Sequence, residues 1–422
     1  MASPAPAFSS LLPSSPPDRR SSDRRLIFAA ALLRGLASGA ISVLAAVYLA
    51  KRGFAEGAIG IVLSAGLAGQ LAGNVYATYF AEAVGRRRSL VVLALLAAAG
   101  GITLAWADTL WAAALAAFCG MLSTQGSDRG GAQALEIAIL PAVVDTRQRT
   151  RTFAWYNALQ DAGGAVGALA AALPALLRDG LQVAEPRAYD ATLFAYAAVL
   201  VVAAACYARL SRQSEPHDVH APHPLGKHDL PPSMKREVRN FSLISMLDSV
   251  GGGFIGSALI AYYLYARFGI NEGALALLFA AARVMTVFSH FAAAWLAGRI
   301  GLVNTMVFTH LPSSLLLLTL PIAPNFGVAA ALFILREGLA EMDVPTRQSY
   351  LMAIVPPHER TWAAGLAQLS RSAGRMVAPA FAGAAMQAGA LWLPLVCGAS
   401  IKIVYDVLLW RAFRRIKPPE EA

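Results

Sequence analysis

The stretch VVDTRQRT at residues 143–150 is matched 211 positions later by IVPPHERT at residues 354–361. Each stretch follows an apolar segment and leads into a segment rich in small residues. A second match joins EGA at residues 56–58 to EGA at residues 272–274, a spacing of 216 positions. Because matching segments occur in the same order, the sequence predicts an internally duplicated chain. Two halves in the same orientation with a cavity between them are an arrangement found in membrane transporters.

Apolar residues make up 57% of the 422 residues, and charged residues only 14%. This composition leaves too little polar surface to cover a water-soluble protein of that length. Apolar runs of about 20 residues, the length that crosses a bilayer as a helix, recur twelve times. The predicted fold is an all-α integral membrane protein with 12 transmembrane helices in two pseudo-symmetric six-helix bundles. The expected spans are residues 26–50, 57–81, 89–107, 110–133, 153–177, 190–210, 241–265, 273–297, 303–323, 327–350, 362–387 and 391–413.

Lysine and arginine are distributed unevenly over the expected loops. With both termini in the cytoplasm, only 5 of the 35 fall on the outer side, and most of the others fall on the cytoplasmic side. This excess is the positive-inside pattern of multi-pass membrane proteins. Basic loops beside an anionic leaflet also explain the net charge of +10, so nucleic-acid binding is not expected. An excess of arginine over lysine and abundant alanine favour a bacterial inner (plasma) membrane.

Polar stretches divide the chain into domains. The sequence predicts a disordered cytoplasmic tail at residues 1–25, an N-terminal bundle at 26–210, a cytoplasmic linker at 211–238, a C-terminal bundle at 239–413 and a cytoplasmic tail at 414–422. The first tail is rich in proline and serine and cannot bury a core. The linker is the other long polar stretch and has the composition of a solvated spacer.

Histidines and cysteines do not predict a metal site. Four of the seven histidines lie in the linker, where spaced imidazoles can ligate a transition metal, but a solvated spacer is the favoured interpretation. The three cysteines lie far apart in apolar spans, so neither a disulfide framework nor a cysteine metal site is expected. The linker histidines are His217, His220, His223 and His228, and the cysteines are Cys119, Cys206 and Cys397.

Residues 78–87 (TYFAEAVGRR) lie between the second and third expected spans, and residues 294–301 (AWLAGRIG) lie at the matching place in the second half. Both resemble the loop Gly-x-x-x-Asp-Arg-x-Gly-Arg-Arg of the major facilitator superfamily, the twelve-helix secondary transporters. Glu82 stands where the family has Asp, and Arg299 and Gly301 match later positions of the motif. The resemblance covers nearly the whole chain and implies alternating access between two six-helix halves.

The resemblance also implies an inner gate. A tight turn in this loop lets a carboxylate and several guanidinium groups meet at the cytoplasmic surface, where ion pairs form in one conformation and break in another. Two further charges fall 211 positions apart at equivalent helix ends. The alternative interpretation is that the arginines only anchor the topology. The residues expected at the gate are Glu82, Arg86, Arg87, Glu136, Arg299 and Arg347.

We assign sixteen charged residues to the membrane region, and ten of them lie in or next to the first, fourth, seventh and tenth expected spans. By the resemblance these four helices line a central cavity, where an ionisable group avoids the roughly 3 kcal/mol that exposure to the bilayer centre costs. The repeat spacing places Arg34 opposite Asp248 or Ser249, so we expect an arginine and an aspartate to meet across the cavity. The residues expected in the substrate and proton cavity are Arg34, Asp128, Arg129, Asp248, Arg283, Arg336, Glu337 and Glu341.

Proton coupling requires a carboxylate whose proton affinity changes when a partner arginine leaves or water enters. The candidates, in order, are Asp248, Asp128, Glu337 and Glu341. The alternative is that intramembrane charges form structural pairs that only fix helix packing. That alternative is favoured for Asp161, Arg371, Arg375, Lys402 and Asp406.

The chain has no Gly-rich phosphate loop ending in Gly-Lys-Ser or Gly-Lys-Thr, no His-Glu-x-x-His motif and no nucleophile elbow, so neither an enzyme nor a cofactor is predicted. The sequence predicts a secondary active transporter that moves a small organic molecule by alternating access, with proton-coupled efflux favoured. Proton-coupled uptake of a polar or anionic metabolite is the alternative, and a non-transporting receptor on the same scaffold is a more remote one. The expected partners are the substrate, protons and the lipid bilayer, and the expected state is a monomer.

Overall fold

A computed structural model describes residues 17–126, 130–140, 149–211, 214–215, 231–355 and 360–414 of the chain. This part of the chain consists of helices and loops and contains no strand. The first half contains α1 (Pro17–Lys51), α2 (Glu56–Tyr79), α3 (Ala81–Val84), α4 (Arg86–Ala105), α5 (Leu110–Cys119), α6 (Gly131–Ile139), α7 (Arg149–Ala170), α8 (Leu173–Leu181) and α9 (Glu185–Ala208). The second half contains α10 (Pro232–Phe254), α11 (Ser257–Phe268), α12 (Glu272–Ile300), α13 (Leu302–Thr319), η4 (Leu320–Ile322), α14 (Phe326–Ala340), α15 (Asp343–Ile354), α16 (Arg360–Gln387) and α17 (Leu393–Phe413).

Nine segments among the described residues are long and apolar enough to cross a membrane. Three of the twelve expected spans are not among these nine. The expected span 110–133 is divided between α5 and α6, and the expected span 327–350 is divided between α14 and α15. The expected span 362–387 is the continuous helix α16, whose first half carries several polar side chains. The all-α membrane fold is confirmed, and the count of twelve is met only in part.

Two helices begin earlier than the sequence indicates. α1 begins at Pro17, inside the tail expected at residues 1–25, and α10 begins at Pro232, inside the linker expected at residues 211–238. In α10 the proline lies in the first turn, where its missing N–H removes no helical hydrogen bond. Polar turns therefore extend both helices beyond their apolar parts. The linker histidines lie outside the described residues.

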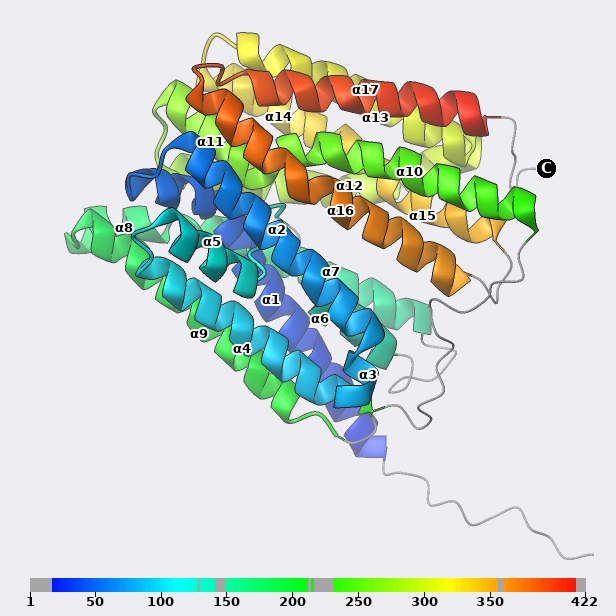
Figure 1. The fold of residues 1–422 in the computed structure, drawn as a ribbon, viewed down its shortest axis with the longest axis horizontal. Helices are drawn as coiled ribbons and strands as arrows, with labels where there is room; N and C mark the ends of the chain where they lie inside the picture. Colours follow the sequence, from blue (N-terminus) through cyan, green and yellow to red (C-terminus); the bar gives the residue numbers. More distant parts are fainter. Residues whose placement is uncertain are drawn as a thin grey trace, which may run out of the picture.

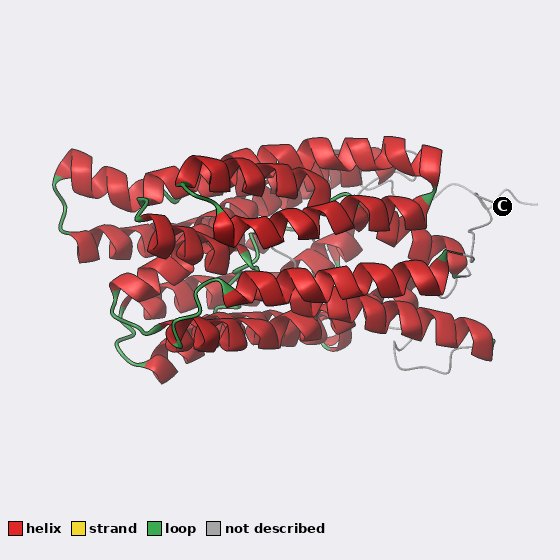
Figure 2. Ribbon diagram, turned by 90° about the horizontal axis from the view of Figure 1, so that it is seen from above, coloured by secondary structure: helices red, strands yellow, loops and turns green. Residues whose placement is uncertain are grey.

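The two bundles lie side by side and diverge toward one end (Figure 1). We call the end with the turns at residues 52–55 and 269–271 the closed end, and the end with the turns at residues 85 and 301 the open end. The bundles are close together where α8 and α11 lie and further apart where α3 and α15 lie. The helices of both bundles run along the same long direction (Figure 2).

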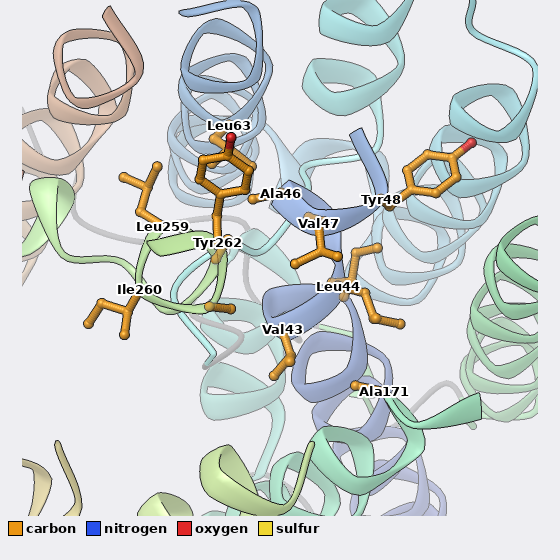
Figure 3. Packing of buried hydrophobic residues seen from close by; sticks show 14 of the residues in the cluster. Val43, Leu44, Ala46, Val47, Tyr48, Leu63, Ala171, Leu259, Ile260 and Tyr262 are labelled. Atoms are coloured by element: carbon orange, nitrogen blue, oxygen red, sulfur yellow. The ribbon is translucent and has the colours of Figure 1, made fainter. Parts of the chain in front are cut away.

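The apolar core is shared between the bundles toward the closed end. One cluster of buried side chains contains Val43 of α1 and Leu63 of α2 together with Leu259 and Tyr262 of α11 (Figure 3). Two further clusters each contain residues of one bundle alone. Burial of apolar surface contributes about 25 cal/mol per Å². The shared cluster therefore holds the bundles together at the closed end, while each bundle keeps its own core toward the open end.

α2 and α16 cross at a pair of glycines. A Cβ on Gly60 would lie 2.3 Å from the carbonyl oxygen of Pro379, and a Cβ on Gly383 would lie 2.3 Å from that of Glu56. Only glycine permits so close an approach of two helix backbones. Ser64 Oγ also accepts a backbone N–H of α16 at 2.9 Å. This crossing joins the two halves near the closed end.

Candidate functional site

A polar cavity lies at the seam between the bundles. Most of its lining comes from the second half, and Gln125 comes from the first. Ionisable groups inside membrane-spanning segments usually mark a pathway for a ligand or an ion. The charged residues that line the cavity are Arg283, Arg336, Arg347, Arg375, Lys402, Asp248, Glu337, Glu341 and Asp343.

Interrupted helices from both halves meet at this cavity. α10 ends at Phe254 and α11 begins at Ser257, because four glycines within residues 251–256 weaken the helix there. The loop between α5 and α6 interrupts the first half in the same way, and its Thr124 carbonyl accepts the backbone N–H of Ala258 at 3.2 Å. Non-helical backbone at membrane depth occurs where it is buried in protein or lines a cavity. The two interruptions therefore place irregular backbone at the seam.

Asp248 is the centre of a buried charge network on the cavity wall. Its carboxylate accepts hydrogen bonds from Lys402 Nζ at 2.6 Å and from Arg347 Nη1 at 3.0 Å. Arg347 Nη1 also lies 3.2 Å from a carboxylate oxygen of Asp343. The four side chains are at most 9% exposed. Their partners must therefore offset the desolvation of every charge in the network.

His310 extends the network to Asp406. The His310 Nδ1 atom lies 2.9 Å from Asp406 Oδ1, and its Nε2 atom lies 3.2 Å from Lys402 Nζ. The complete network contains three carboxylates, one guanidinium, one ammonium and one imidazole. Its formal charge is therefore one negative unit when the imidazole is neutral, and protonation of the imidazole cancels that unit. A single proton changes the charge balance of a site that is shielded from bulk water.

The first half holds an equivalent pair with the charges exchanged. Arg34 Nη2 lies 2.6 Å from Glu136 Oε2, and two tyrosine hydroxyls also donate to this carboxylate, at 2.7 and 2.6 Å. Arg34 stands 214 positions before Asp248, and Glu136 stands 211 positions before Arg347. The duplication has therefore kept a buried ion pair between the same two helical positions while reversing its polarity.

The structure brings five of the eight expected cavity residues to the cavity. Asp128 and Arg129 lie outside the described residues. Arg34 pairs with Glu136 in its own bundle and does not meet Asp248 across the cavity, contrary to expectation. The physical reason is the reversed polarity of the two pairs, which gives each buried charge an opposite partner within its own half. The five that line the cavity are Asp248, Arg283, Arg336, Glu337 and Glu341.

The residues expected at the inner gate are not gathered in one cluster. Glu82 and Arg86 form an ion pair at 2.6 Å near the open end. Arg87 donates to a backbone carbonyl just beyond α9 at 3.1 Å. Arg299 stacks on the exposed ring of Trp295, 4.2 Å from its centroid. These side chains lie on separate bundles whose open ends are apart in this structure (Figure 1).

Glu136 and Arg347 were expected at the same gate. Both are buried inside their bundles, at 0% and 3% exposure. The repeat spacing correctly marks them as equivalent positions, but α6 and α15 turn the two side chains toward partners in their own bundles. They therefore belong to the two buried ion pairs and do not contact Glu82 or Arg86.

Four members of the charge network were not among the expected site residues, and they are Asp343, Lys402, Asp406 and His310. Lys402 and Asp406 were assigned to structural pairing, and His310 was not singled out. Lys402 and Asp406 stand four residues apart on one face of an apolar helix, which is a signal for a shared buried partner. His310 lies inside the expected span 303–323, where an imidazole also needs a polar partner. The sequence does not show that α13 packs against α17, and this packing brings His310 to Lys402 and Asp406.

The comparisons with known proteins agree with this geometry. The model of the Major Facilitator Superfamily matches residues 27–240 and 241–422. The chain belongs to the major facilitator superfamily, and it is a multi-pass membrane transporter. The uncharacterized membrane protein YJR124C of Saccharomyces cerevisiae is 25% identical to it over 419 residues, covering 92% of this chain and 93% of that one.

Solved structures of transporters share the fold. A bacterial homolog of the human lysosomal transporter Spinster, in an inward-facing and occupied conformation, has a TM-score of 0.73 at 13% identity and covers 95% of this chain and 98% of its own. The nucleoside transporter NupG has a TM-score of 0.68 at 13% identity, with 94% and 99% covered. A POT family transporter in complex with a thioalcohol-conjugated peptide has a TM-score of 0.70 at 11% identity, with 93% and 96% covered. At these identities the likeness shows the fold.

Proposed function

We propose that this transporter exports a small organic molecule by alternating access and couples export to the movement of protons. The observation that carries the proposal is the seam cavity, whose wall is the charge network around Asp248. The cavity offers a volume for a substrate, and the network offers a place where a proton changes the charge beside it. One chain encloses the cavity, so the proposed working unit is a monomer.

The proposed orientation places both termini in the cytoplasm, which makes the open end the cytoplasmic end. The concentration of arginines at the turns of this end supports that orientation. The proposed location is the inner membrane of a bacterium, on the composition of the chain. The present conformation would then give the cavity access to the cytoplasm. The opposite state requires the closed end to separate and the open end to meet, and in this proposal Glu82, Arg86 and Arg299 form contacts there.

In the proposed cycle, Asp248 changes its partners when a proton enters the network. Its carboxylate now attracts both Lys402 and Arg347. A protonated carboxyl group attracts them far less, so the two cations would reorient toward the cavity and toward the other acids of the network. Protonation would thereby alter both the charge that a substrate meets and the packing between α10, α15 and α17.

Replacing Asp248 by asparagine tests this proposal, because the amide keeps the shape of the side chain but cannot exchange a proton. A thermal-shift screen of detergent-purified protein at two pH values first identifies a ligand that binds the protein. We then expect Asp248→Asn to abolish substrate movement driven by an imposed pH gradient in proteoliposomes, with membrane insertion intact. The matched control is Asp108→Asn, on a side chain that is 84% exposed. Undiminished coupled transport in Asp248→Asn would refute the assignment.

Proton-coupled uptake of a polar or anionic metabolite is the second candidate, and the polar, arginine-rich lining of the cavity favours it. The two directions differ in one measurement. In vesicles of known orientation, an exporter exchanges substrate for protons, whereas an importer moves substrate and protons the same way. A non-transporting receptor would bind the same ligand and show no flux in either orientation.

A further inference from the structure

Hydrogen-bond donors from both halves converge at the seam end of the cavity, which we define by Gln125, Ser257, Arg283 and Arg336. The guanidinium of Arg283, on α12, lies 3.4 Å from the backbone carbonyl oxygen of Gln125. Gln125 Nε2 and Arg336 Nε are buried, and neither has an acceptor among the described residues. Arginine has donors only, and buried donors without acceptors are uncommon. Two buried donors at the seam end therefore have no acceptor among the described residues.

The seam end also has an excess of positive charge. Arg347 and Lys402 are balanced by the acids of the charge network, and Arg336 pairs with its neighbour Glu337. Arg283 has no carboxylate within ion-pair distance among the residues that the structure describes, which do not include 127–129. A half-buried guanidinium of this kind favours an anion as its partner.

The backbone around Arg283 leaves room for this arrangement. Gly126 has a φ of +75°, and a Cβ on it would lie 1.9 Å from Arg283 Nη2. Glycine at this position therefore admits the guanidinium to the seam. α11 begins at Ser257, so the partial positive charge of its first turn faces the same region.

We infer that the seam end binds an anionic group of the substrate, a carboxylate or a phosphate. Arg283 and Arg336 donate to the oxygens of the anion from the second half, and Gln125 donates from the first. Because its donors come from both bundles, a bound anion joins the halves at the point where they must rock. The inference rests on the proposed transport function and names the substrate class of the same cavity.

The test uses matched small molecules that differ in their anionic group. Detergent-purified full-length protein is heated with benzoate or benzamide, with succinate or succinamide, with phenyl phosphate or phenol, and with inorganic phosphate. We expect acidic members to raise the melting temperature more than their neutral partners do. The carboxylate and phosphate arms show which anion the site prefers. Arg283→Gln should weaken acid binding about tenfold or more, whereas Arg411→Gln, on an exposed arginine of α17, should leave it unchanged.

Gly126→Ala is the second variant, since it keeps the arginine but places a methyl group where the guanidinium lies. It should also weaken acid binding, and the melting temperature without ligand shows whether each variant is folded. The inference is overturned when no acid stabilises the protein, when neutral partners stabilise it equally, or when both variants keep the wild-type response. Acid-selective binding without flux in proteoliposomes would refute transport and leave the anion site standing. Flux of neutral or cationic compounds alone, unchanged in Arg283→Gln, would refute the anion site and leave transport standing.

Discussion

Glu136 and Arg347 occupy equivalent positions of the two halves and carry opposite charges. Glu136 is buried against Arg34 of its own half, and Arg347 is buried against Asp248 of its own half. An ion pair inside a bundle is favourable only while both partners are present, because one buried charge alone keeps its desolvation penalty. The two charges of the pair can therefore exchange positions between the halves. Neither charge can be lost without leaving the other uncompensated.

Removing one partner of the first-half pair should destabilise the protein. Glu136→Gln leaves Arg34 with an uncompensated buried charge, so we expect a loss of about 3–5 kcal/mol in the free energy of unfolding. The measurement is thermal unfolding of the detergent-purified variant. The double variant Arg34→Gln with Glu136→Gln removes both charges and should lose less than the single variant. A single variant that melts like the wild type would contradict this account of the pair.

The crossing of α2 and α16 shows how a helix pair can hold one end of the molecule closed. The glycines at 60 and 383 let the backbones touch, and the shared apolar cluster lies around them. α1 with α7 and α10 with α16 pack within one bundle, whereas α2 and α16 come from different halves. The contact must therefore separate if the closed end opens.

Gly60→Val should push α2 and α16 apart, because its Cβ has no room beside the backbone of α16. We expect a longer distance between spin labels at Leu181 and Ala388, measured by electron double resonance in a variant whose native cysteines are serine. Gly298→Val is the matched control, since nothing lies within 4 Å of a Cβ at that position. A distance distribution that both variants leave unchanged would show that the crossing does not hold the closed end.

At the scale of the whole molecule, two glutamates at equivalent helix starts tie the halves together. Glu56 accepts a hydrogen bond from the hydroxyl of Tyr262 at 2.9 Å, and Glu272 accepts one from the hydroxyl of Tyr189. Arg178 also lies 3.3 Å from Glu272. Each glutamate accepts a hydrogen bond from the other half, so two such contacts hold the closed end together.

Removing these hydrogen bonds should shift the population toward the state with a separated closed end. A hydrogen bond to a carboxylate contributes about 1.5–3 kcal/mol, so Tyr262→Phe or Tyr189→Phe should change the ratio of the two states about tenfold or more. The same spin-label pair measures the ratio. Tyr79→Phe, at the open end of α2, is the control. Equal ratios in the wild type and in the double phenylalanine variant would rule out the two latches.

The sequence alone determined the membrane fold of this protein and its duplication. The order of residues along the chain shows the apolar lengths, the positions of arginine and a repeat such as residues 143–150 with 354–361. In lipid, a helix satisfies the backbone hydrogen bonds within its own segment. The sequence also predicted that Asp248 and Arg283 need a polar environment, since each is a charge inside a span, and both line the seam cavity.

Only the tertiary structure decided which charges are partners. Arg34 pairs with Glu136 and not with Asp248, and His310 enters the network through the packing of α13 against α17. The interruption of the fourth span and its contact with Ala258 also come from the meeting of two halves. Pairing energies depend on distances of a few ångströms between residues far apart in the chain. Repeat spacing shows which positions of the two halves are equivalent, whereas side-chain packing decides which residues touch.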